Sequence, residues 1–335
     1  MSKSKLYGSS SHSGISGQAS LTAQEVLEHL FPNQSLLSEL DRMSIRSGNR
    51  VKGMLAGKRR SSSLGGSQEF ADYRPYSPGD DVRRIDWNVY GRTGKAYMRQ
   101  YWDEQELQVS LYVDVSRSMH FGERNGKKLP YALRLAACLG YMALGGDDRV
   151  SIKLFRERIV NELQPLHGRA AVPKLFQFLG EALSLSDSEQ KTEQASDADF
   201  TNISMPFNSG TALPRRPGSA WVLTDAMFDS GVEETIVSLL AAGQKVVLVH
   251  LLSQEEIDPE LSGELKLVDS ELGTDKDVAI GHKVLKDYKA AVTEFQLKLK
   301  RICAERGAVY VFVNTSTPLE ETIRHTLLSS QLLNN

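Results

Sequence analysis

The sequence predicts an α/β protein with a doubly wound, mostly parallel, Rossmann-like sheet. From Ala96 onward, apolar runs of strand length alternate with segments whose apolar residues recur at helical spacing. The run 245–251 is almost continuously apolar, as expected of a strand covered on both faces. Polar residues follow where two strands should end, which is where such sheets bind ligands.

The first third of the chain precedes this pattern. Residues 1–20 are rich in serine and glycine and are expected to form a disordered tail. Short amphipathic helices are expected over 21–31 and 34–45. Charged and aromatic residues then crowd into 69–92, where Arg and Asp are interleaved. They could pair to hold a loop in place, or, with Tyr and Trp, form a recognition surface.

The remaining elements are assigned from periodicity and turn residues. Strands are expected over 96–102, 107–113, 150–155, 158–163, 220–223, 245–251 and 308–313, and a hairpin over 264–268 and 277–280. Helices are expected over 130–145, 172–183, 232–242, 288–302 and 319–328, and a mobile acidic loop over 184–199.

This order predicts three parts. They are a tail at 1–20, a segment of helices and charged motif at 21–105, and an α/β domain at 106–335. The fold would therefore carry a small N-terminal and inserted β-rich subdomain. No internal repeat is visible in the chain.

Composition excludes several functional classes. The 335 residues hold 40 Lys and Arg against 42 Asp and Glu, which is too balanced for a protein that binds mainly to phosphates. No apolar run approaches the roughly 18 residues of a membrane helix. Cys138 and Cys303 lack metal-ligand spacing and are expected to be buried free thiols. We therefore expect a cytoplasmic protein that binds no nucleic acid and has no membrane span.

One polar cluster stands out as a candidate metal site. Asp114, Ser116 and Ser118 follow directly after the expected strand 107–113. Carboxylate and hydroxyl oxygens are the hard ligands that Mg²⁺ prefers. Asp225 stands at the end of another expected strand, and the carboxyl ends of parallel strands can face one crevice. The alternative interpretation is a capping cluster before the helix at 130.

A loop threonine commonly completes a ligand set of this kind. The chain offers Thr201 and Thr211, which precede Asp225 by different distances. The longer spacing from Thr201 leaves room for a short helix before the strand, so Thr201 is favoured and Thr211 is the alternative. The last coordination position would then be open to water or to a carboxylate from a partner.

Two motifs, in a fixed order, resemble those of a known family. The first is Glu69-Phe70, Arg74, Tyr76, Pro78-Gly79-Asp80-Asp81, Arg83 and Ile85-Asp86-Trp87, and the second is Asp114-Val115-Ser116-Arg117-Ser118-Met119. Over roughly residues 35–330 the chain is similar to a bacterial family of domains of unknown function, the fifty-eighth in that numbering. That family resembles the von Willebrand factor A domain.

The resemblance implies a metal-ion-dependent adhesion site on Asp114, Ser116, Ser118 and Asp225, with Thr201 as the loop ligand. Members are often encoded beside MoxR-type AAA+ ATPases, which implies an adaptor in a chaperone-like or assembly system. The expected function is thus a non-enzymatic, Mg²⁺-dependent interaction module that binds an acidic partner segment.

Two other functions are weighed against this one. A phosphatase or phosphotransferase could use Asp114 as its nucleophile. Enzymes of that type carry a second Asp two residues on, where this chain has Ser116, although His120 is nearby as a possible acid. Nucleic-acid binding through the arginines of 74–92 is disfavoured because acidic residues in the same segment match them.

Overall fold

A six-stranded sheet forms the centre of the computed structural model, which describes residues 23–31, 33, 35–45, 70–101, 107–122, 126–189, 202–259, 263–268 and 275–334. Its strand order is β11-β8-β7-β4-β5-β6. All neighbours are parallel except β5 and β6. The strands are β4 (Gln108–Asp114), β5 (Arg149–Phe155), β6 (Ile159–His167), β7 (Gly218–Thr224), β8 (Gln244–Leu252) and β11 (Val309–Asn314). The predicted mixed α/β architecture with a mostly parallel sheet is confirmed.

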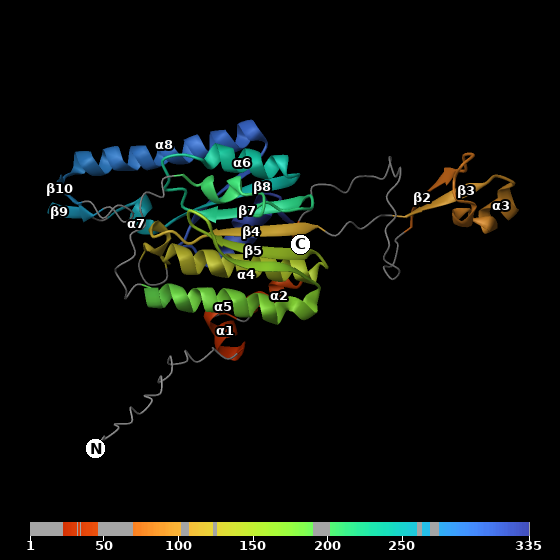
Figure 1. Cartoon of the computed structure of the whole chain (residues 1–335), viewed down its shortest axis with the longest axis horizontal. Coiled ribbons are helices and arrows are strands. Elements are labelled where there is room, and N and C mark those ends of the chain that lie inside the picture. The colour runs from red at the N-terminus through yellow and green to blue at the C-terminus, as the bar shows by residue number, and fades with distance from the viewer. Residues whose placement is uncertain are drawn as a thin grey trace, which may run out of the picture.

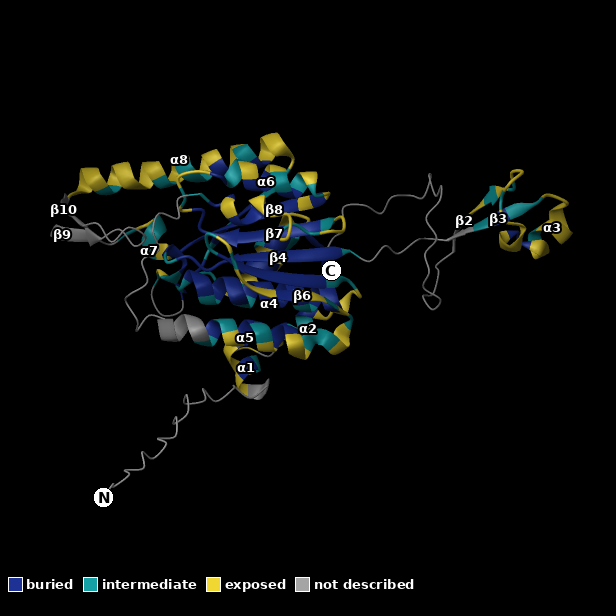
Figure 2. Ribbon diagram, in the orientation of Figure 1, coloured by how far each residue is buried: buried dark blue, intermediate teal, exposed yellow. Residues whose placement is uncertain are grey.

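Helices cover both faces of this sheet (Figure 1). One face carries α4 (Lys128–Gly145) and α5 (Val172–Glu189), and the other carries α6 (Val232–Ala241) and α8 (His282–Arg306). Side chains alternate along each strand, so Leu111 of β4 belongs to the core under α4 and α5. Tyr112 belongs to the core on the opposite face. Every residue of β4 is buried, and Figure 2 shows the same for the middle of the sheet.

Shorter elements surround the sheet. α1 (Ala23–Leu30) packs against α5, where a side chain at Gly180 would meet Val26 at 2.6 Å. β9 (Gly263–Val268) and β10 (Asp275–Ile280) form the predicted hairpin. The others are α2 (Ser35–Leu40), β1 (Ser44–Ile45), the 3-10 helices η2 (Ser118–His120), η4 (Arg169–Ala171) and η5 (Met205–Asn208), α7 (Gln254–Ile257), α9 (Leu319–Glu321), the π-helix η6 (Thr322–Leu327) and β12 (Leu333–Asn334).

Three predictions need correction. The helix expected over 34–45 ends at Leu40, because residues 44–45 pair with β12 near the other end of the chain. The loop expected over 184–199 was predicted to start too early, since α5 continues to Glu189. The rest of that expected loop lies outside the described residues. The helix expected over 319–328 is divided into α9 and the π-helical turn that follows it. The expected tail at 1–20 also lies outside the described residues.

The state of the two cysteines and the hydropathy of the helices were both predicted from the sequence. Cys138 and Cys303 are buried and free, as predicted. Among the described helices, none has the length and apolar character needed to cross a bilayer.

The charged and aromatic motif forms an antiparallel unit of its own. β2 (Phe70–Pro75) pairs with β3 (Tyr97–Tyr101). The segment that connects these two strands contains η1 (Val82–Arg84) and α3 (Trp87–Thr93). The guanidinium of Arg74 donates two hydrogen bonds of 2.7 Å to the carboxylate of Asp80. Asp86 caps α3 through the backbone of Asn88 and Val89 and also accepts bonds from Tyr73 and Arg99. The predicted Arg–Asp pairing is therefore confirmed.

We predict that Asp86→Ala loosens this unit without affecting the central sheet. The change removes the cap of α3 together with the acceptor that joins β2 to β3. Amide hydrogen exchange in 73–99 should accelerate several-fold, while exchange in β4 and β7 stays unchanged. Asp81→Ala is the matched control, because Asp81 accepts only the backbone bond of Arg83. Equal exchange in the two variants would contradict the role given to Asp86.

Candidate metal centre

The turn after β4 brings together the three residues predicted from its motif. The backbone N–H of Ser116 donates to Asp114 Oδ1 at 2.9 Å, the local bond with which Asp initiates a turn. This bond folds the chain so that Ser116 Oγ and Ser118 Oγ lie 3.1 Å apart. All three side chains are buried, and Asp114 has no exposed surface. Asp114, Ser116 and Ser118 thus form one cluster of oxygen atoms.

The end of β7 adds a hydroxyl that sequence reasoning missed. The β4–β7 register pairs Val113 with Leu223, so the next residues, Asp114 and Thr224, are neighbours on one face. Thr224 Oγ1 donates to Asp114 Oδ2 at 2.6 Å. The sequence held a signal for this contact, because Thr224 occupies in its strand the position that Asp114 occupies in β4.

Asp225 is also buried at this edge, where it pairs with a lysine that was not predicted. Its Oδ2 accepts a bond of 2.7 Å from Lys128 Nζ, and its Oδ1 accepts the backbone N–H of Met227 at 3.1 Å. Lys128 is the first residue of α4 and has no exposed surface. Its ammonium also donates to Glu256 Oε1 at 2.5 Å.

Glu256 is held in place from two directions. Its Oε2 accepts the backbone N–H of Ser253 at 2.8 Å, and Ser253 Oγ accepts the backbone N–H of Glu256, which completes a capping box for α7. From α8, Tyr288 donates its hydroxyl to the Glu256 carbonyl at 2.8 Å. The Lys128 ammonium therefore joins α4 to the end of β7 and to the helix that follows β8.

The charges of this cluster do not balance. Among the described residues it contains the carboxyl groups of Asp114, Asp225 and Glu256 against the single ammonium of Lys128. Burial, and after it the neighbouring Asp225 charge, raise the pKa of Asp114 to about 7, even though bonds from Thr224 and Ser116 oppose the rise. Burial opposes the charge on Lys128, but Asp225 and Glu256 outweigh it and raise its pKa. With all four groups ionised, the deficit equals one divalent cation.

His250 of β8, close to this cluster, adds no positive charge. Burial lowers the pKa of His250 to about 4, so its ring is neutral near pH 7. Its Nδ1 lies 2.9 Å from the hydroxyl of Tyr310. The imidazole is therefore part of the core under this edge of the sheet.

The loop threonine stays a prediction. Thr201 lies outside the described residues. The next residue, Asn202, forms an isolated bridge with Ser230 in the loop after β7. Thr211 is exposed, and its hydroxyl contacts Ser209 at 3.2 Å.

The donor set fits a hard cation better than a soft one. Among the described residues, no three His, Cys, Asp or Glu side chains group closely enough to hold a metal by themselves. A cation at this edge would therefore depend on hydroxyl oxygens as well as carboxylates, which is the oxygen chemistry of Mg²⁺.

Comparison with known proteins gives a family match and distant relatives. Residues 72–297 match the family described as Protein of unknown function DUF58. Uncharacterized proteins of Mycobacterium bovis and Mycobacterium tuberculosis are 23% identical over 280 residues, which cover 84% of this chain and 85% of theirs.

Two solved structures show a weaker likeness. The conserved hypothetical protein BatB from Bacteroides thetaiotaomicron is 16% identical, with a TM-score of 0.38 over 67% of this chain and 98% of its own. An aerotolerance-related membrane protein from Bacteroides fragilis is 18% identical, with a TM-score of 0.38 over 67% of this chain and 99% of its own.

We predict that Lys128→Met lowers the free energy of unfolding by roughly 3–5 kcal/mol, because it leaves the buried Asp225 carboxylate and the partly buried Glu256 carboxylate without their cation. Urea unfolding in the presence of EDTA measures the loss. The double variant Lys128→Met with Glu256→Gln should recover part of it, since one of the stranded charges is removed. Lys174→Met, on the exposed side of α5, is the control and should change little. A Lys128 variant as stable as this control would contradict the network.

We also predict that Asp114→Asn gains stability over the wild type as pH rises, when both are free of metal. The folded-state pKa of Asp114 is raised from 3.8 to about 7, so its contribution is favourable at low pH and is lost as the carboxyl ionises across this interval. The gain should reach a few kcal/mol at most, since one pKa unit corresponds to about 1.4 kcal/mol.

The measurement compares urea unfolding of the two proteins at both ends of that pH range, in EDTA. Only their difference is informative. The lowered pKa of His250 makes a stabilising contribution in both proteins that is lost as pH falls from 6.5 towards about 4. This contribution opposes the Asp114 trend in the wild type and cancels in the difference between the two proteins. A difference that stays constant with pH would contradict the assignment to Asp114.

Proposed function

The chain belongs to the DUF58 family, and we propose that it is a non-enzymatic, metal-dependent protein-interaction module. In this proposal its sheet corresponds to a von Willebrand factor A-like fold, and the edge after β4 and β7 is a metal-ion-dependent adhesion site. One observation carries the proposal. Asp114 is buried among neutral donors, Ser116 and Thr224, while the only described ammonium of the cluster is bound to Asp225 and Glu256.

The residues that would hold Mg²⁺, or another divalent cation, come from both strand ends. Asp114, Ser116 and Ser118 would supply oxygens from β4 and its turn. Asp225 would contribute from β7, with Thr201 as the expected loop ligand. Lys128 and the backbone N–H of Met227 hold the Asp225 carboxylate in one orientation, and Thr224 does the same for Asp114.

A bound cation of this kind supplies an open coordination position for a carboxylate from another protein. We therefore propose that the partner presents an acidic segment to this edge of the sheet. The resemblance of the two sequence motifs supports a MoxR-type AAA+ ATPase as a further partner, with this chain as the adaptor between the ATPase and its client.

A phosphatase with Asp114 as nucleophile is less well supported. Ser116 stands where a second acid would protonate the leaving group. Hydrolysis of a phosphate ester that is lost in Asp114→Asn would favour this alternative.

We predict that Asp114→Asn weakens Mg²⁺ and Mn²⁺ binding by at least about tenfold, since even residues that only orient metal ligands contribute this much. Calorimetric titration of the full chain measures the affinity, and the shift of the unfolding temperature with added MgCl₂ checks it independently. Asp258→Asn is the control, because Asp258 is an exposed carboxylate that pairs with Lys289 outside the site.

The same pair of variants tests partner capture. Pull-downs from bacterial lysate in MgCl₂ and in EDTA, with and without ATP, should recover an AAA+ ATPase or an acidic client with the wild type and Asp258→Asn. Asp114→Asn should recover neither in a Mg²⁺-dependent manner. Recovery of the same proteins by all three, whatever the metal, would show that capture does not depend on this site.

A further inference from the structure

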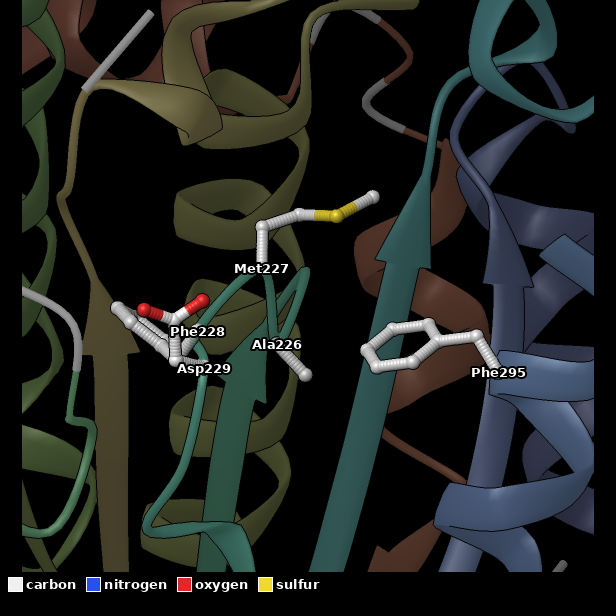
Figure 3. A pocket seen from close by; sticks show the side chains of 5 residues that line it. All are labelled: Ala226, Met227, Phe228, Asp229 and Phe295. Carbon is white, nitrogen blue, oxygen red and sulfur yellow. The ribbon is translucent and has the colours of Figure 1, made fainter. Parts of the chain in front are cut away.

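A pocket of about 280 Å³ opens immediately beside the cluster. Figure 3 shows Met227 on one side of it and Phe295 of α8 on the other, with β8 passing between them. The described residues that line it are Ala226, Met227, Phe228, Asp229 and Phe295. Four of these residues directly follow Asp225, so the pocket wall and the Asp225 side of the proposed metal site belong to one loop.

The groups that shape the cluster also fix this wall. Ala226 has a φ of 53°, a left-handed conformation that is costly for a residue with a side chain. Its backbone N–H donates to Thr224 Oγ1 at 2.9 Å, and the backbone N–H of Met227 donates to Asp225 Oδ1. The backbone N–H of Phe228 closes the turn on the Ala226 carbonyl at 2.8 Å. The pocket therefore has its shape only when Thr224 and Asp225 are in place.

The surfaces around the pocket are mostly apolar. Phe295 packs edge-on against the buried ring of His250, with centroids 5.6 Å apart, which holds the phenyl group in place. Met227 is 40% exposed, although it is a large apolar side chain next to a buried polar cluster. Thioether side chains suit surfaces that adapt to a bound apolar group. Asp229 is the only carboxylate among the residues that line the described pocket.

We propose that this pocket receives one large apolar side chain of the acidic partner segment, next to the carboxylate that binds the metal. The inference rests on the proposed function and specifies its partner as a Glu or Asp with a Leu, Ile, Met or Phe beside it. The volume lies at the lower end of the range of ligand pockets, roughly 300–1,000 Å³, and is large enough for one side chain between Met227 and Phe295. The shared loop places the two contacts within reach of one short peptide.

The test is selection of peptides on the full chain. The probe is a displayed library of short peptides with a fixed central Glu and random neighbours, selected in MgCl₂. Wild type should enrich large apolar residues next to the Glu. For an enriched peptide, Met227→Ala should weaken binding roughly tenfold, as expected at the centre of an interface. Leu297→Ala is the matched control, since Leu297 is an apolar residue of α8 with 57% exposure that does not line the pocket.

A double comparison isolates the pocket contact. A peptide whose apolar residue is replaced by Ala should bind wild type and Met227→Ala equally, which measures the coupling between the two side chains. Met227→Ala retains the backbone N–H that donates to Asp225 and changes only the side chain. Its Mg²⁺-induced shift of the unfolding temperature, compared with that of the wild type, shows whether the variant is folded and binds metal.

The outcomes separate the two proposals. Binding that needs Glu and Mg²⁺ but shows no apolar preference, or that Met227→Ala and Leu297→Ala affect equally, would overturn the pocket and leave the metal site standing. Selection with no requirement for Glu or Mg²⁺ would overturn the proposed function itself.

Discussion

The ammonium of Lys128, buried between Asp225 and Glu256, is the contact on which the carboxyl edge of the sheet depends. Removing an ammonium and two carboxylates from water is costly, and attraction compensates only when the geometry is good and the remaining oxygens are also bonded. Here they are, because Met227 donates to the second oxygen of Asp225 and Ser253 to that of Glu256. The start of α4, the end of β7 and the start of α7 can therefore meet in one arrangement in which each of these three charged groups has hydrogen-bond partners.

This contact makes the cluster electrostatically uneven. On the β7 side Asp225 has its own cation, whereas on the β4 side Asp114 has only the neutral donors of Ser116 and Thr224. Hydrogen bonds from neutral groups stabilise a carboxylate less than a cation does, which is why burial dominates and raises the pKa of Asp114. The uncompensated negative charge of the cluster therefore lies on the β4 side, next to the hydroxyls of Ser116 and Ser118.

The central sheet and part of this cluster follow from local sequence patterns. β4, β5, β7, β8 and β11 were predicted because their residues are apolar over strand lengths, and Asp114, Ser116 and Ser118 because a single turn carries all three. Thr224 required the strand register, which a sequence specifies only through pairing across the sheet. The pairing of β1 with β12 joins two-residue strands from opposite ends of the chain, so no local pattern could indicate it.

Lys128 and Glu256 were missed for a different reason. A lysine in the first turn of a helix normally extends into solvent, and a Glu three residues after Ser253 suggests a capping box and nothing more. Their burial depends on where α4 and α7 meet β7 in space, which is a property of the tertiary fold. Sequence patterns therefore identified the ligand-like residues of the cluster but not the groups that hold them in position.

Asp86 and Asp225 use their carboxylates in the same way, although they lie in different parts of the protein. One oxygen of each carboxylate accepts hydrogen bonds from backbone N–H groups of the turn that follows. The other oxygen accepts a hydrogen bond from a cationic side chain, which is Arg99 for Asp86 and Lys128 for Asp225. In both places a large apolar residue just after the Asp is exposed, Trp87 at 61% and Met227 at 40%. A side chain whose backbone is fixed in this manner loses little further freedom on binding, so it contributes more of its buried surface to affinity. The same carboxylate chemistry therefore stabilises each turn and fixes the backbone of an exposed apolar residue within it.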